Sequence, residues 1–135
     1  MLKLVIGVKG TGKTKTLIGL VNEAAENSKG AVICIEKGDK LRYDVKHQAR
    51  LIDTEEYFID DAQSLFGFVA GLFASNHDIT DLFIDSALKI CKNDNAGFDK
   101  FLDEMSALVE KLNVNVVMTS SIPTDSASET VKKYI

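Results

Sequence analysis

The sequence has few of the residues that fix disulfide-rich, metal-bound or membrane-spanning folds. Its 135 residues include two cysteines and one proline, and the longest apolar run covers residues 65–74. That run is about half of the roughly 20 residues that a membrane-spanning helix needs, so it predicts a core helix. Cys34 and Cys91 have no CxxC spacing and no neighbouring histidine, which excludes the common zinc motifs and predicts two reduced thiols.

Export and nucleic-acid binding also lack support. The amino terminus has only a short apolar run before Lys9, without the long apolar segment and cleavage site of a signal peptide. The net charge of −4 disfavours a protein that neutralises nucleic-acid phosphates. We therefore expect a cytoplasmic protein that binds neither nucleic acid nor a membrane.

Short apolar runs alternate with helical patterns along the chain. The runs are nearly continuous, as in parallel strands that are covered on both faces. The length suits one domain, residues 1–135. The sequence predicts a doubly wound α/β fold, with a mainly parallel five-stranded sheet and helices on both faces. The predicted strands are residues 2–8, 31–35, 49–52, 82–84 and 114–118.

Three long helices and one short helix are predicted around these strands. The first runs to about Asn27, and the next two cover residues 61–76 and 97–112, with apolar residues at helical spacing. After the sole proline, Ser126 and Glu129 have the spacing of a capping box, which predicts a last short helix.

The predicted helix 61–76 carries a strip of small residues beside its large apolar ones. The strip consists of Gly67, Ala70, Gly71 and Ala74. A glycine inside a helix costs roughly 1 kcal/mol relative to alanine, so we expect close packing to compensate. The expected neighbour is the chain's own sheet or another of its helices, with a second copy of the chain as the alternative.

A glycine-rich motif follows the first predicted strand. Residues 7–14, GVKGTGKT, fit G-x-x-x-x-G-K-[ST], with an apolar strand before them and a helical pattern after them. The glycines allow successive backbone N–H groups to point at phosphate oxygens, and the helix start adds its own N–H groups. Lys13 can then reach the β and γ phosphates of a nucleotide, and the Thr14 hydroxyl is suited to Mg²⁺.

This motif resembles the Walker A loop of the P-loop NTPase superfamily, and the strand arrangement resembles the RecA-like branch of that superfamily. The resemblance implies a small ATP-binding protein that uses Mg²⁺. No guanine-recognition motif N-K-x-D is found, so we expect ATP rather than GTP. The predicted cofactor-binding residues are Gly7, Lys9, Gly10, Thr11, Gly12, Lys13, Thr14 and Lys15.

The superfamily places an acidic magnesium partner, the Walker B aspartate, at the end of an apolar strand. Two strings fit: DLFIDS offers Asp85, and YFIDDAQ offers Asp60 or Asp61. We favour Asp85, because Asp60 and Asp61 stand where helix 61–76 begins and would serve as its cap and first-turn acids. The predicted metal ligands are therefore Thr14 and Asp85, with Asp61 as the alternative to Asp85.

The catalytic equipment that the resemblance implies is incomplete. A glutamate often follows the Walker B aspartate and polarises the attacking water, but Ser86 stands there. Thr119 or Ser120 matches the position of a γ-phosphate sensor at the end of the last strand, and a plain loop start is an equal interpretation. The predicted catalytic residues are Lys13, Asp85 and Thr119.

Three functional hypotheses follow. The first is an ATP-binding protein, acting as a slow ATPase and nucleotide-dependent switch with a protein partner or as a homodimer. The second is a small-molecule or nucleotide kinase, which is hard to build with Arg42 and Arg50 as the only arginines. The third is a scaffold with a vestigial nucleotide site, which Ser86 favours and the intact glycine-rich motif disfavours.

Two polar features have modest interpretations. Lys9 lies inside the glycine-rich loop, and we expect it to be solvated or to steer phosphate. The polar segment 36–53 is expected to be an ordinary surface connection, with a mobile flap near the site as the alternative.

Overall fold

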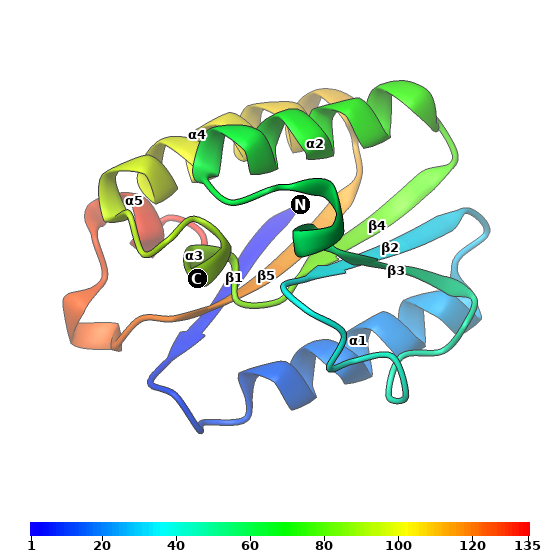
Figure 1. Cartoon of the computed structure of the whole chain (residues 1–135). Coiled ribbons are helices and arrows are strands. Elements are labelled where there is room, and N and C mark those ends of the chain that lie inside the picture. Colours follow the sequence, from blue (N-terminus) through cyan, green and yellow to red (C-terminus); the bar gives the residue numbers. More distant parts are fainter.

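Five parallel strands form the centre of the molecule, in the order β1-β5-β4-β2-β3 (Figure 1). The computed structural model describes all residues, 1–135. Most residues of β2, β4 and β5 are buried, because helices cover both faces of the sheet. The predicted α/β fold with a parallel five-stranded sheet is confirmed. The strands are β1 (Leu2–Gly7), β2 (Ala31–Glu36), β3 (Ala49–Asp53), β4 (Ile79–Ile84) and β5 (Asn115–Ser121).

The two faces of the sheet carry different numbers of helices. α1 covers one face alone, whereas α2 and α4 lie over the other face (Figure 1). Leu17 and Val21 of α1 belong to a smaller hydrophobic cluster, and Leu65 of α2 and Phe98 of α4 belong to a larger one. The helices are α1 (Lys13–Asn27), α2 (Ala62–Ser75), α3 (Ala87–Ile90), α4 (Asn95–Leu112) and α5 (Glu129–Lys132), with short 3-10 helices η1 (Thr54–Tyr57) and η2 (Thr124–Ser126).

Most predicted boundaries lie close to the observed ones, and the exceptions have local causes. α4 begins before the predicted Gly97, because the Asp94 carboxylate accepts a hydrogen bond from the Gly97 N–H at 3.1 Å and caps the helix. The predicted capping box at Ser126 is wrong. Ser128 caps α5 instead, and its hydroxyl accepts from the Val131 N–H at 3.1 Å.

The small-residue strip of α2 does not pack inside the molecule. Gly67, Gly71 and Ala74 are exposed, and a methyl group added at either glycine would meet no neighbouring atom within 4 Å. The expectation of close packing within the chain is therefore wrong. α2 instead buries the stripe of Leu65, Val69 and Phe73. No helix is long and apolar enough to cross a membrane.

The topology brings distant segments together at the carboxyl ends of the strands. β5 lies between β1 and β4, with Val5 paired to Thr119 and Ile84 paired to Met118. Because all strands are parallel, the loops after β1, β2, β4 and β5 leave the sheet at the same end. The glycine-rich loop, Asp85 and Thr119 therefore lie together at the carboxyl ends of the strands.

Candidate phosphate-binding site

The glycine-rich loop joins the end of β1 to the start of α1. Gly7 ends the strand, and Gly12 is the N-cap of the helix. Gly10 and Gly12 have φ angles of 88° and 83°, in the left-handed region that side chains disfavour. An added methyl group at either glycine would point into open space, so conformation rather than crowding requires glycine there.

The start of α1 has hydrogen-bond donors without acceptors in the chain. No side chain caps the helix, and its first turn contains no acidic residue. The N–H groups of Lys13, Thr14 and Lys15 donate to no group of the protein. The first turn of a helix in this state favours an anion, because its N–H groups and its dipole both present positive charge.

Lys13 lies against the loop that precedes it. Its ammonium group donates to the Val8 carbonyl at 2.8 Å and lies 3.5 Å from the Thr11 hydroxyl. The Thr11 hydroxyl donates to the same carbonyl at 2.8 Å. The positive charge of Lys13 is thus held at the mouth of the loop. Lys9 and Lys15 are exposed and form no ion pair.

Thr14 and Asp85 are in direct contact, although they lie 71 residues apart. The Thr14 hydroxyl is 3.1 Å from one carboxylate oxygen of Asp85 and 3.3 Å from the other. Asp85 directly follows β4 and is half-buried. A hydroxyl and a carboxylate are hard oxygen donors of the type that Mg²⁺ prefers, and they lie under the glycine-rich loop.

Thr119 contacts Asp85 from the neighbouring strand. Its buried hydroxyl donates to Asp85 Oδ1 at 2.8 Å and accepts from the Ser86 N–H at 2.8 Å. Ser86 has a φ angle of 54°, an uncommon value for a residue with a side chain. Ser120 adds a second hydrogen bond between β5 and the segment after β4, since its hydroxyl accepts from the Leu88 N–H at 3.2 Å. The hydroxyl of Thr119 therefore positions the carboxylate of Asp85.

The alternative acids are engaged elsewhere. Asp61 caps α2: its carboxylate accepts from the Ser64 N–H at 2.7 Å, and the Ser64 hydroxyl accepts from the Asp61 N–H at 3.2 Å. Hydrogen bonds from the Ser64 backbone and side chain to the carboxylate hold the pKa of Asp61 below its usual range. Asp60 forms a surface ion pair with Lys92 at 3.2 Å. Neither carboxylate bonds to the glycine-rich loop.

Glu36 is a candidate that the sequence analysis missed. It ends β2 beside β4, where the Asp85 N–H donates to the Ile35 carbonyl at 2.9 Å. Its carboxylate is buried and accepts one N–H from Lys40 and one from Leu41, each at 3.1 Å. The sequence did contain a signal for Glu36, because this acid directly follows the apolar run AVICI in the same way that Asp85 follows DLFI.

The electrostatic environment of Glu36 is set by burial. Burial raises the pKa of its carboxyl, the two N–H contacts partly oppose that rise, and the negative charge of Asp85 adds to it. The same negative charges act on Cys34. Burial together with Glu36 and Asp85 raises the pKa of the Cys34 thiol to about 12.

The segment after Glu36 is a packed connection and not a flap. Leu41 and Val45 are buried in the hydrophobic cluster of α1. The Asn22 amide donates to the Asp44 carbonyl at 2.8 Å and accepts from the Lys46 N–H at 2.8 Å. These contacts fix the segment on α1.

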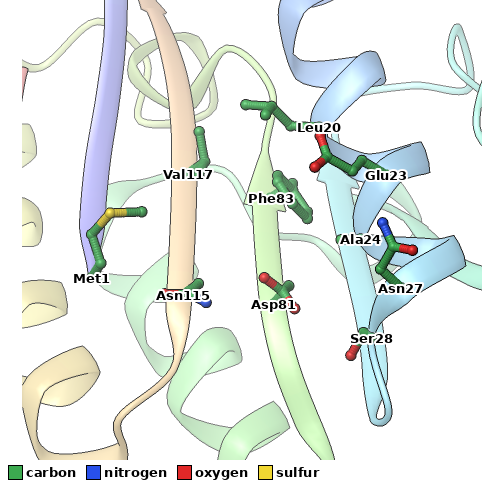
Figure 2. A pocket seen from close by; sticks show the side chains of 10 residues that line it. All are labelled: Met1, Leu20, Glu23, Ala24, Asn27, Ser28, Asp81, Phe83, Asn115 and Val117. Atoms are coloured by element: carbon green, nitrogen blue, oxygen red, sulfur yellow. The ribbon is translucent and has the colours of Figure 1, made fainter.

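An open cavity of about 400 Å³ lies at the opposite end of the strands, between α1 and the amino-terminal ends of β5 and β4 (Figure 2). Phe83 and Val117 form its apolar floor, and Glu23 and Asp81 contribute carboxylates. No residue of the glycine-rich loop lines this cavity. It is therefore separate from the candidate phosphate site.

Comparison with known proteins supports the fold. No family model and no curated protein sequence matches the chain, whereas 129 chains of solved structures do, so the architecture is widely shared. One is the crystal structure of a KaiC-like protein from the hyperthermophilic archaeon Pyrococcus horikoshii OT3, with a TM-score of 0.69 and 16% sequence identity. The match covers 97% of this chain, which spans 65% of the length of the KaiC-like chain. The chain thus shares the α/β fold of that protein.

Proposed function

We propose that the protein binds ATP with Mg²⁺ at the glycine-rich loop. The observation that carries the proposal is the contact between Thr14 and Asp85 at 3.1 Å, directly below a loop whose following helix has free N–H groups. The fold brings this hydroxyl and this carboxylate, which lie 71 residues apart in the sequence, to the place where a phosphate cradle would need a cation.

The residues present fit the nucleotide and the metal. The N–H groups at the start of α1 and the ammonium group of Lys13 would hold phosphate oxygens. Thr14 and Asp85 would hold Mg²⁺, with Thr119 fixing the carboxylate of Asp85. The bound metal would supply neutralisation of the charge on the phosphate oxygens.

We further propose that hydrolysis is slow and that Glu36 is its general base. Glu36 is the buried carboxylate beside Asp85, and its raised pKa makes the ionised group a stronger proton acceptor for a water molecule. Arginine assistance is missing from the site, since Arg42 pairs with Asp39 on the surface and Arg50 lies on β3. Slow turnover suits a nucleotide-dependent switch with a partner.

The test is isothermal titration with ATP, ADP and GTP, with and without Mg²⁺. We expect Mg²⁺-dependent binding of ATP. Lys13→Ala should weaken binding by about 10- to 100-fold, because a charged hydrogen-bond donor is lost. Asp85→Asn should remove the Mg²⁺ dependence. Asp61→Asn is the matched control, because it neutralises the alternative acid and retains an oxygen for the helix cap.

Three outcomes oppose the proposal. Equal ATP affinity in Lys13→Ala and the parent would refute the phosphate cradle. Loss of the Mg²⁺ dependence in Asp61→Asn alone would move the metal away from Asp85. For hydrolysis, phosphate release that is unchanged in Glu36→Gln would exclude Glu36 as the base, provided that ATP binding is also unchanged.

A further inference from the structure

One edge of the sheet is open to pairing. β3 is an outer strand that pairs only with β2. The N–H and C=O groups of Arg50, Leu51 and Ile52 form no backbone hydrogen bond outside that pairing. The opposite edge is partly covered, because the Leu4 N–H of β1 donates to the Tyr134 carbonyl at 2.7 Å. Edge strands usually carry protection such as proline, lysine or a bulge, and β3 has none of these, with Arg50 and Asp53 as its charged residues.

An apolar groove runs beside this edge. It has a volume of about 290 Å³, with Ile52 of β3 on one side and Phe68 and Leu72 of α2 on the other. Tyr57 also lines the groove and stacks on Phe68 with ring centres 5.9 Å apart. The next residue, Phe58, is 89% exposed. An exposed aromatic residue beside an apolar groove and an open strand marks a surface for protein contact.

The helix that borders the groove is also unusual for a surface helix. α2 contains no charged residue, and its outer side is the strip of small residues. A solvent-facing helix normally carries charges on its outer face. The groove and the edge of β3 therefore continue into a surface without charge.

The charges along β3 differ in sign between its two ends, so they would complement those of a second, antiparallel copy of the strand. Arg50 is the second residue of the strand, whereas Asp53 ends it and Glu55 and Glu56 follow in η1. Arg50, Glu55 and Glu56 form no ion pair within the chain. An antiparallel partner with the same sequence would place its negative end beside the positive end of this strand.

We propose that a second copy of this chain pairs with β3 across a two-fold axis, which joins the two sheets into one. Leu51 is the central residue of β3. Pairing centred on Leu51 therefore places Arg50 of each copy opposite Ile52 of the other, next to the Asp53 that ends that strand. The two apolar grooves then face each other across the axis. This dimer is independent of nucleotide binding.

The test is sedimentation equilibrium of the parent and of charge-reversed variants at low ionic strength. Arg50→Glu leaves only acidic charges between residues 50 and 56, and Glu55→Lys with Glu56→Lys makes the acidic end of this segment net positive. We expect each variant alone to dimerise about tenfold more weakly than the parent, since two symmetric contacts become repulsive. Mixing the two variants should restore dimerisation as a heterodimer. Lys100→Glu, an exposed reversal on α4 outside this surface, is the matched control and should dimerise like the parent.

Each outcome decides the proposal. A parent that stays monomeric at all concentrations overturns it and leaves the edge for a strand of another protein. A dimer that both variants form as well as the parent overturns it too, because the interface then lies elsewhere. Hydrogen exchange adds a direct readout, since the amides of β3 should exchange more slowly at concentrations where the dimer forms.

Discussion

The hydroxyl of Thr119 makes two hydrogen bonds that fix the corner after β4. Replacing Thr119 by valine keeps the shape and leaves the Ser86 N–H without a partner. We expect a loss of about 1–3 kcal/mol in the free energy of unfolding. We also expect a 10- to 100-fold weaker Mg²⁺ affinity of the ATP complex, because Asp85 loses the group that orients it. Calorimetric titration with and without Mg²⁺ measures the second effect.

The serine variant is the control for this prediction. Thr119→Ser keeps the hydroxyl and should restore the Mg²⁺ dependence. Binding of ATP without Mg²⁺ should be the same in Thr119→Val and the parent. An equal loss with and without Mg²⁺ would show instead that Thr119 contacts phosphate, as a γ-phosphate sensor does.

Glu36 gives a pH-dependent prediction. Its pKa is raised in the folded state, so the folded protein holds the carboxyl proton more tightly than the unfolded chain does. The stability that this proton provides is complete below the ordinary pKa of 4.5 and is lost as the pH rises through the raised value. In Glu36→Gln this loss of stability with rising pH should be absent. Urea unfolding of both proteins between about pH 4 and pH 8 measures the difference, and parallel curves would contradict the prediction.

Part of the site was predictable from the sequence and part was not. The spacing of the glycine-rich motif selects Lys13 and Thr14, and the acid after an apolar run selects Asp85. Thr119 was selected by its place at the strand end, but its contacts depend on β5 lying next to β4, which a linear pattern does not give. Glu36 was missed because it was read as the start of a polar loop and not as the end of a strand.

At the scale of elements, α2 contains two glycines that serve no packing purpose in the single chain. Gly67→Ala and Gly71→Ala should each raise the free energy of unfolding by roughly 0.5–1 kcal/mol, because alanine favours the helix and meets no neighbour. Thermal unfolding of dilute protein should show an increase of a few degrees for the pair.

The matched control lies on the same helix. Ala74→Gly, at an exposed position of the strip, should lower the stability by a similar amount. A decrease in stability for Gly67→Ala or Gly71→Ala would mean that something packs closely against the strip in solution.

The long elements followed from periodicity, and the short ones did not. Apolar runs located all five strands and the three long helices, because each buries a continuous stripe. α3, η1 and η2 have three or four residues each, too few to show a period. The cap of α5 was misplaced because Ser126 and Ser128 stand two residues apart and sequence spacing alone does not choose between them.

For the whole molecule, the two cysteines report on whether both faces of the sheet unfold together. Cys34 lies in the cluster on the α1 face and Cys91 in the cluster on the other face, and burial raises the pKa of each thiol to about 12. Neither thiol should react with a disulfide reagent in the folded protein. In Cys34→Ala and Cys91→Ala, the remaining thiol should react at a rate set by global unfolding.

The two variants control each other. After correction for the stability of each variant, the two thiols should give the same free energy of opening. A much faster reaction of one thiol would show that its face opens by itself. The alternation of strands and helices predicted the layers of the fold, but the position of the last strand inside the sheet came only from the structure.

The position of β5 inside the sheet has a consequence for the nascent protein. The strand that separates β1 from β4 is made after the four other strands of this sheet. Until it emerges, the loop near the amino terminus and the acid after β4 have no strand to hold them in register. The nascent chain should therefore gain the proposed affinity for nucleotide in a single step, when residues 115–121 leave the exit tunnel. Until that step the chain would carry a complete glycine-rich motif without an assembled site.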